Sequence, residues 1–198
     1  MVLKKTFPDI SAAVLAGGRA LRFGGINKAL MQVSGIPLIT RITALLEPLF
    51  SEIIIAGWPA GDPLPPGVRT VADNYPGIGP LGGIEAALKA SQSPSLFVFG
   101  CDMPWLSGQL ISEQAEFFLR NPSDILSARS NGLPEPLHSI YSRRIHPSLV
   151  TYIEQGGSPA VIDFFKIVDT GYYDFPVTGE ARKTLTNINR PEDIATWT

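Results

Sequence analysis

The feature of this sequence that most restricts its fold is the apolar stretch 10–16, I-S-A-A-V-L-A, which ends in paired glycines. A stretch of this kind is typical of a strand buried on both faces, and such strands occur mainly in parallel sheets covered by helices. The residues that follow, G-G-R-A-L-R-F-G-G-I-N-K, combine four glycines with three cationic side chains. A buried strand that opens onto a cationic glycine loop predicts an α/β protein that binds a phosphorylated ligand.

The glycine loop contains the chemical groups that a polyphosphate needs. Glycines without a Cβ let backbone N–H groups approach phosphate oxygens, and Lys and Arg side chains neutralise the negative charge. Gly17 and Gly18 supply the first property, and Arg19 and Lys28 supply the second. The loop matches neither G-x-x-x-x-G-K-[ST] nor G-x-G-x-x-G, so it belongs to neither of those phosphate-binding classes. The alternative interpretation is an exposed turn whose cations are solvated.

Further apolar segments predict strands that alternate with helices. We expect strands over 52–56, 68–72, 95–100, 124–129 and 137–141, the last of them antiparallel. Helices are expected over 38–49, 80–90, from the N-cap Ser107 to 120, and over 143–155, 160–165 and 191–197, with 166–174 extended. Strands joined through helices imply right-handed crossovers and a mostly parallel sheet, and ligands of such sheets lie beyond the carboxyl ends of the strands.

Composition narrows the class of protein. The chain has 198 residues, 44% of them hydrophobic, which suits one domain with a full core. A net charge of −2 argues against a general binder of nucleic acid or of anionic membranes. One cysteine and two histidines exclude an internal disulfide and a cysteine-based zinc site. Because no apolar run is long enough to span a membrane and the first nine residues lack a signal-peptide core, we expect a cytoplasmic enzyme.

Two aspartates follow predicted strands directly. Asp73 comes after 68–72 and Asp102 after 95–100, so both are expected at the sheet edge that also carries Gly17. A carboxylate that faces a cationic loop can hold a Mg²⁺ ion that bridges nucleotide phosphates, and we assign that role to Asp102. Asp73 is expected to position the nucleotide or the metal. For both aspartates the alternative is a cap on the next turn.

Four blocks of sequence carry a resemblance to one family: L-A-G-G-R-x-x-R-F-G-G-x-x-K-A-L near the start, D-N-Y-P-G-I-G-P-L-G-G-I at 73–84, C-D-M-P-W-L at 101–106 and N-I-N-R-P-E-D-I at 187–194. In this order they resemble the nucleotidyltransferases of the sugar-nucleotide pyrophosphorylase type, and within that group the molybdenum cofactor guanylyltransferases. The resemblance implies a three-layer, Rossmann-like fold. It also implies Mg²⁺-dependent transfer of GMP from GTP to the terminal phosphate of molybdopterin, with release of pyrophosphate.

The resemblance also implies roles for individual residues. Lys28, Arg19 and Asp102 would be catalytic, with Asp102 as the metal ligand. Asn187, Asn189 and Arg182 would bind the acceptor. The nucleotide would contact Leu15, Ala16, Gly17, Gly18, Arg19, Lys28, Asp73 and Asp102. The chain is then a single nucleotidyltransferase domain whose residues 1–106 bind the nucleotide and whose residues 107–198 bind the acceptor. We expect a monomer whose partners include molybdoenzyme maturation proteins.

The sequence departs from the family pattern at three places. Asn27 stands where the family usually has Asp, Ala56 where it often has Asn, and 156–159 lacks the usual arginine. Cationic contacts to the anionic acceptor are therefore expected from Arg129, Arg182 or Arg190. Other acceptor contacts are expected from 137–141, 156–158 and 187–189.

Several alternatives remain open from the residues. His138 either faces the acceptor or is a satisfied polar residue, and Cys101 is interpreted as a packing residue. Asn187 and Asn189 alternatively form a turn and cap before Pro191. The alternative functions are transfer from CTP or to another phosphorylated acceptor, and, more distantly, a non-catalytic cofactor carrier or assembly partner.

Overall fold

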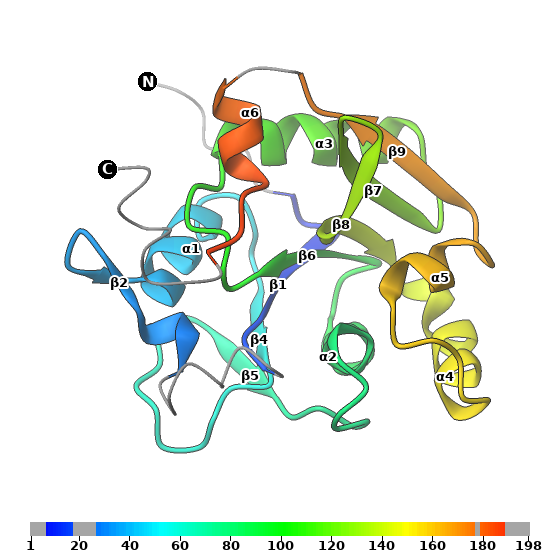
Figure 1. Ribbon diagram of the computed structural model, residues 1–198, viewed down its shortest axis with the longest axis horizontal. Coiled ribbons are helices and arrows are strands. Elements are labelled where there is room, and N and C mark those ends of the chain that lie inside the picture. Colours follow the sequence, from blue (N-terminus) through cyan, green and yellow to red (C-terminus); the bar gives the residue numbers. More distant parts are fainter. Residues whose placement is uncertain (1–6, 18–26, 177–178, 189–198) are drawn as a thin grey trace.

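The computed structural model describes residues 7–17, 27–176 and 179–188, and a mixed sheet runs through their centre (Figure 1). Within these residues the sheet has seven strands in the order β5-β4-β1-β6-β8-β7-β9. The strands are β1 (Ile10–Leu15), β4 (Ile53–Ala56), β5 (Arg69–Val71), β6 (Ser95–Gly100), β7 (Ile125–Ser130), β8 (Leu133–Ser142) and β9 (Thr170–Asp174). β8 pairs antiparallel with β6 and β7, and the other pairings are parallel. The expected mostly parallel sheet, with an antiparallel strand at 137–141, is confirmed.

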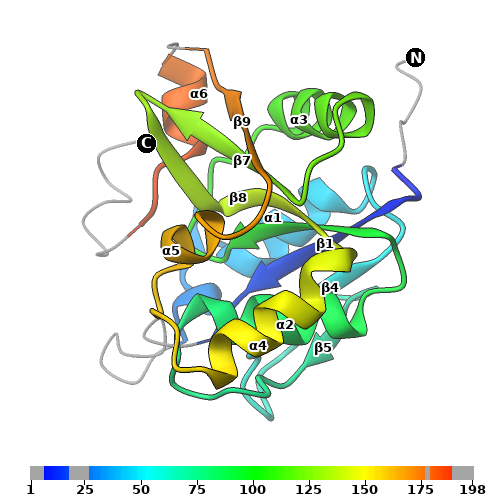
Figure 2. The same ribbon diagram turned by 90° about the vertical axis from the view of Figure 1, so that its right-hand side faces the viewer.

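Helices cover both faces of the sheet (Figure 2). α1 (Leu38–Leu46) and α3 (Gly108–Arg120) pack on one face. α2 (Pro80–Ala90), α4 (His146–Glu154) and α5 (Val161–Phe165) pack on the other. This is the three-layer, Rossmann-like arrangement that was expected. The 3₁₀ helices η2 (Lys28–Leu30) and η3 (Arg143–Ile145), the hairpin of β2 (Gln32–Val33) and β3 (Ile36–Pro37), and α6 (Gly179–Thr184) complete the described elements.

The central strand β1 shows why the apolar stretch folds as it does. All six of its residues are buried. Ala12 and Val14 contribute to the cluster that contains α1 and α3, whereas Ala13 and Leu15 contribute to the cluster that contains α2. Because successive side chains of a strand point to opposite faces, a strand covered on both sides is mostly apolar, and the buried Ser11 hydroxyl donates a hydrogen bond to the Ser93 Oγ at 2.8 Å. The core therefore lies in two layers, one on each side of the sheet.

Most helix predictions hold, with shifted ends. Ser107 caps α3 by accepting a hydrogen bond from the backbone N–H of Leu110, and the helix ends at Arg120 as expected. The helix expected over 38–49 ends at Leu46, and the one expected over 143–155 divides into η3 and α4. Only residues 170–174 of the expected extended segment form a strand. The helix expected over 191–197 lies outside the described residues.

Two described elements were missed by the periodicity argument. The β2–β3 hairpin turns at Ser34 and Gly35, which both have positive φ values of 52° and 77°. Such a two-residue turn matches the right-handed twist of the strands. α6 is short and lacks an apolar stripe in its sequence, G-E-A-R-K-T. Among the described helices, none combines the length and the apolar character that a membrane crossing requires.

Candidate active site

The carboxyl ends of four parallel strands define one edge of the sheet. The strand register aligns Leu15 of β1 with Ala56 of β4 and with Gly100 of β6, and it aligns Ala56 with Val71 of β5. Gly17, Gly57, Asp73 and Asp102 each follow one of these strand ends by one or two residues. The structure therefore brings Gly17, Asp73 and Asp102 to one edge, as the alternation of strands and helices predicts.

Lys28 and Asp102 meet at this edge although they are 74 positions apart in the sequence. The Lys28 Nζ lies 3.0 Å from the Asp102 Oδ2, and the two side chains are 6% and 22% exposed. A cation this buried requires a charged partner, and in the absence of a ligand Asp102 supplies it. The two side chains assigned to phosphate and metal binding thus form one ion pair, in which Lys28 is buried and Asp102 is partly exposed.

Asn27 positions Lys28 and explains one departure from the family pattern. The Asn27 Oδ1 accepts a hydrogen bond from the backbone N–H of Ala29 at 3.0 Å and so caps η2. Its Nδ2 donates to the Asp62 Oδ2 at 2.8 Å. An aspartate at this position would repel Asp62 instead of donating to it, so Asn27 is matched to its neighbour in this chain.

The chain returns to Asp102 near the end of its described part. The backbone N–H of Ile188 donates to the Asp102 carbonyl at 2.8 Å. Ile188 is fully buried in a cluster with Val33 and Leu38. The neighbouring Asn187 has a buried Oδ1 with no hydrogen-bond partner in the part of the chain that the structure describes. The predicted acceptor residue Asn187 is therefore adjacent in sequence to the residue that contacts the backbone of Asp102.

Asp73 lies against the first turn of α2. Its Oδ1 accepts a hydrogen bond from the backbone N–H of Tyr75 at 2.8 Å, so the expected alternative, a turn cap, is present in the structure. Gly82 makes room for the carboxylate, because a Cβ on Gly82 would overlap it. Asp73 is thus held at a helix N-terminus, where a negative charge is favourable.

Two glycines let β1 and β4 end side by side. Gly57 has a φ of +75°, and a Cβ built on it would lie 2.7 Å from the Gly17 Cα. The close approach of the two backbones therefore requires glycine at position 57. The sequence reasoning missed Gly57, although a glycine directly after a predicted buried strand was a signal that could have found it.

The other residues predicted to contact the nucleotide either have buried side chains or lie outside the residues that the structure describes. Leu15 and Ala16 are 8% and 0% exposed, so a ligand would contact their backbone rather than their side chains. Gly18, Arg19, Asn189 and Arg190 lie outside the described residues. Arg182 belongs to α6, of which the backbone is described at that position.

The expectation that 137–141 contacts an acceptor through its side chains is wrong for four of its five residues. His138, Ser139, Ile140 and Tyr141 are fully buried in the core. The His138 Nδ1 lies 3.0 Å from the Gln114 Oε1, and its ring packs against Phe97, Phe99 and Phe175. Burial lowers the pKa of His138 to about 3. The alternative, a satisfied polar residue, holds for one ring nitrogen, whereas the buried Nε2 has no hydrogen-bond partner among the described residues.

Cys101 is buried immediately before Asp102. Burial is the main cause that raises the pKa of its thiol to about 12. A thiol of this kind stays protonated and is unreactive at neutral pH. This agrees with the interpretation of Cys101 as a packing residue.

Glu135 is a carboxylate near Asp102 that sequence reasoning missed. The register of β7 and β8 jumps between Ser127, which pairs with Ser139, and Ala128, which pairs with Glu135. The residues 136–138 of β8 therefore form a bulge, closed by a hydrogen bond of 2.7 Å from the Ser139 Oγ to the Glu135 carbonyl. Burial and the nearby Asp102 raise the pKa of Glu135. The signal was the pair of prolines at 134 and 136, since proline disrupts a regular strand ladder.

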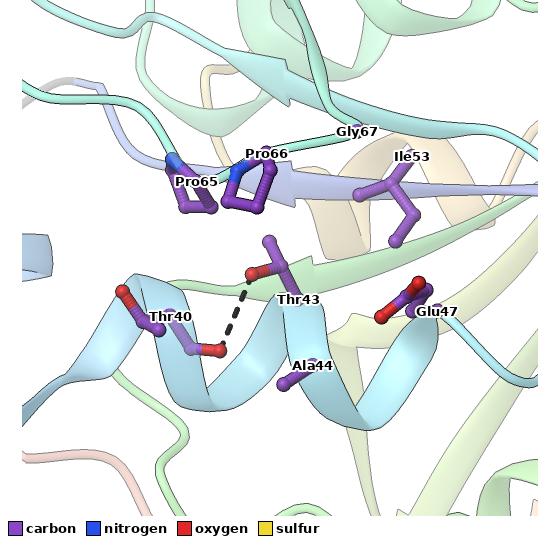
Figure 3. A pocket seen from close by; sticks show the side chains of 8 residues that line it. All are labelled: Thr40, Thr43, Ala44, Glu47, Ile53, Pro65, Pro66 and Gly67. Carbon is purple, nitrogen blue, oxygen red and sulfur yellow. Dashed lines mark hydrogen bonds between the residues drawn. The ribbon is translucent and has the colours of Figure 1, made fainter.

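Two surface hollows of the described residues are lined by neither Lys28 nor Asp102. Figure 3 shows one of about 120 Å³ between α1 and the proline-rich loop, lined by residues such as Thr40, Thr43 and Pro66. Its lining includes none of the predicted site residues. Within the described ranges, no three His, Cys, Asp or Glu side chains come together in a way that could hold a metal ion. Lys28, Asp102 and their surroundings are therefore the chemical centre of the described sheet edge.

Solved structures of other proteins share this architecture. The solved structure of molybdopterin-guanine dinucleotide biosynthesis protein A from Archaeoglobus fulgidus superposes with a TM-score of 0.77 at 22% identity and covers 94% of this chain and 95% of that one. A 2-C-methyl-D-erythritol 4-phosphate cytidylyltransferase from Thermus thermophilus superposes with a TM-score of 0.65 at 15% identity, covering 93% and 95%. These likenesses show the fold.

Sequence comparison adds the family. The molybdenum cofactor guanylyltransferase of Vibrio atlanticus is 31% identical over 185 residues, which is 93% of this chain and 93% of that protein. A probable molybdenum cofactor guanylyltransferase of Pelotomaculum thermopropionicum is 32% identical and covers 93% of this chain and 89% of its own length. The family described as MobA-like NTP transferase domain matches residues 12–168. The fold, the sheet edge with its ion pair and these matches lead to one conclusion: the chain belongs to the MobA-like NTP transferase family and is a nucleotidyltransferase.

Proposed function

We propose that this enzyme transfers GMP from GTP to the terminal phosphate of molybdopterin and releases pyrophosphate, with Mg²⁺ as cofactor. The curated relatives that match over nearly the whole chain carry the name molybdenum cofactor guanylyltransferase. The observation that carries the proposal is the contact of 3.0 Å between Lys28 and Asp102 at the carboxyl edge of the sheet. This contact supports the proposal, because a cation that could bind phosphates lies beside a carboxylate suited to a divalent ion.

The residues present fit a Mg²⁺ ion. Mg²⁺ usually retains several waters and is held by one or two carboxylates together with substrate phosphates, rather than by a cage of protein ligands. Asp102 would be its protein ligand, because its carboxylate is partly exposed at the sheet edge where the phosphates are expected. When bound, the ion would neutralise charge on the nucleotide phosphates.

The chain's own residues would act by positioning and by neutralising charge. Lys28 and Arg19 would contact the phosphates of GTP, together with backbone N–H groups of the glycine loop. The acceptor phosphate is already an anion, so its oxygen needs no strong general base before it attacks the α-phosphorus. A bond forms between that oxygen and the α-phosphorus while the bond from the α-phosphorus to the leaving pyrophosphate breaks. The protein's contribution is therefore alignment of the two substrates in a line.

Acceptor binding is assigned to Asn187, Asn189 and Arg182, with Arg190 as a further cation. Molybdopterin is anionic, and guanidinium groups make paired contacts with phosphate oxygens. Neutralising Arg182 and Arg190 together should raise the apparent KM for the acceptor while GTP affinity is unchanged. If acceptor kinetics stay the same in an active double variant, the acceptor lies elsewhere.

Calorimetric titration with GTP, CTP and ATP in the presence of Mg²⁺ tests the proposal most directly. We expect GTP to bind tightest. In a separate assay of GMP transfer, Asp102→Asn should lose on the order of 10²-fold or more in rate, because the substitution removes the negative charge at the reacting phosphates. Asp124→Asn is the matched control, since Asp124 pairs with Arg144 outside this edge. Preferential binding of CTP would transfer the assignment to a cytidylyltransferase. Near-normal turnover of Asp102→Asn at limiting Mg²⁺ would reduce Asp102 to a structural role.

A further inference from the structure

The loop 72–79, between β5 and α2, carries Asp73 and contains two glycines. Gly77 and Gly79 both adopt positive φ values, 92° and 81°, and most of the loop is exposed. A loop of this composition samples many conformations unless side chains tie it down. The position of Asp73 therefore depends on what holds the loop against its neighbours.

A buried carboxylate in α2 holds it. Glu85 is 2% exposed, and each of its carboxylate oxygens has a partner. Its Oε2 accepts a hydrogen bond of 2.8 Å from the Nδ2 of Asn74, the residue next to Asp73. Its Oε1 lies 2.8 Å from the Nε2 of His146 in α4. A buried carboxylate is costly unless its oxygens are satisfied, so both partners are needed for Glu85 to lie where it does.

A second, more exposed contact links the same loop to the same helix. The Tyr75 hydroxyl donates to the Glu154 Oε1 at 3.0 Å, and Glu154 is the last residue of α4. Asn74 and Tyr75 are thus both connected to α4, the first through Glu85 and the second directly. The loop that follows β5 is fastened to a helix from the opposite half of the chain.

We propose that Glu85 is a positioning residue, which bridges Asn74 and His146 and so holds the loop 72–79, and with it Asp73, in the arrangement that binds the nucleotide. This inference rests on the proposed function, in which Asp73 contacts the nucleotide. Glu85 itself touches no substrate. It acts by removing loop freedom before binding, so that the nucleotide does not have to order the loop.

The first test compares Glu85→Ala with Glu85→Gln. Loss of one hydrogen bond that orders a binding loop should weaken the affinity for GTP about tenfold with little change in kcat. Glutamine keeps an oxygen that accepts from Asn74, so Glu85→Gln should recover most of the affinity. Hydrogen–deuterium exchange of the peptide that contains 73–79 should be faster in Glu85→Ala and close to wild type in Glu85→Gln, whether or not nucleotide is present.

Glu52→Ala is the matched control. Glu52 is also a largely buried carboxylate with several donors, among them Ser11 and the backbone N–H of Gln92, but it lies at the start of β4, the end opposite to the candidate site. Its loss should lower the free energy of unfolding without changing GTP affinity or exchange in the loop. If both variants weaken GTP binding equally, the effect of Glu85 is general destabilisation and the proposal is overturned.

A double-mutant cycle separates positioning from packing. Asn74→Ala and His146→Ala should show non-additive effects on GTP affinity in the wild-type background, because both act through Glu85, and additive effects once Glu85 is alanine. Additivity in both backgrounds would refute the bridge. Faster loop exchange without any change in GTP affinity would also overturn the proposal. If the wild-type protein binds no nucleotide, the proposed function fails. The role of Glu85 is tested separately: unchanged hydrogen–deuterium exchange of the loop 72–79 in Glu85→Ala would refute it.

Discussion

His138 should make the stability of this protein depend on pH. The imidazole is fully buried and its pKa is lowered to about 3, whereas a histidine in the unfolded chain has a pKa of 6.5. Between these values the unfolded state binds a proton that the folded state does not, so stability falls as the pH falls. The slope is about 1.4 kcal/mol per pH unit, which amounts to a loss of about 2 kcal/mol between about pH 7 and about pH 5.

Urea unfolding of wild type and of His138→Gln at these two pH values measures this contribution. The substitution is expected to lower the free energy of unfolding at neutral pH. The informative quantity is the difference between the two pH values, which should be about 2 kcal/mol smaller in the variant. Phe175→Leu is the control, since Phe175 packs on the same ring at 5.2 Å and carries no titratable group. An equal pH dependence in wild type and His138→Gln would show that the imidazole is protonated or reaches water in the folded state.

Three further predictions concern charge and backbone. Lys28→Ala should weaken the binding of GTP, CTP and ATP by a similar factor in calorimetric titrations. Lys89→Ala, which changes an exposed lysine of α2, should leave nucleotide binding unchanged. An altered base preference in Lys28→Ala would place Lys28 elsewhere in the site. Glu135→Gln should raise the melting temperature at neutral pH, because the raised pKa of Glu135 means that its ionisation costs more free energy in the folded state than in the unfolded state. The gain in melting temperature should vanish as the pH falls below the ordinary carboxyl range. A gain that persists at low pH would contradict the reasoning. Gly57→Ala should lower the free energy of unfolding, measured in urea, by more than about 1 kcal/mol. The loss should exceed that of Gly61→Ala, because Gly61 also has a positive φ but a Cβ there would meet open space. Equal losses would mean that backbone strain alone matters.

Local patterns in the sequence were sufficient to predict the elements that build the sheet edge. β6 and α2 have the bounds expected from apolar runs and from Pro80, because a buried strand and an amphipathic helix each leave a continuous signal. The meeting of Gly17, Asp73 and Asp102 followed from parallel strand order alone. No periodicity or spacing in the sequence predicts that Lys28 lies close to Asp102. That contact was expected only because both residues were assigned to the nucleotide phosphates.

Features that depend on distant contacts could not be predicted in this way. Glu85 shares the apolar face of α2 with Leu81 and Leu88, but only the packing of α2 on α4 brings His146 to it. The bulge at 136–138 depends on the pairing of β8 with two neighbours at once. The prolines at 134 and 136 mark a disrupted ladder, but they do not indicate that the side chains of 138–141 are buried.

The contact between Ile188 and Asp102 can form only late in the synthesis of the chain. Domains generally begin to fold from the N-terminus while the ribosome is still adding residues. All seven strands of the described sheet precede residue 186, so the sheet can assemble on the nascent chain before the segment 186–188 is available to cover Asp102. A chain arrested at this stage would hold its strands in place but leave the cluster around Val33 and Leu38 without Ile188. The segment that contacts the Asp102 backbone is thus synthesised after every strand of the described sheet, and a nascent chain would acquire a stable scaffold before it acquires a complete site.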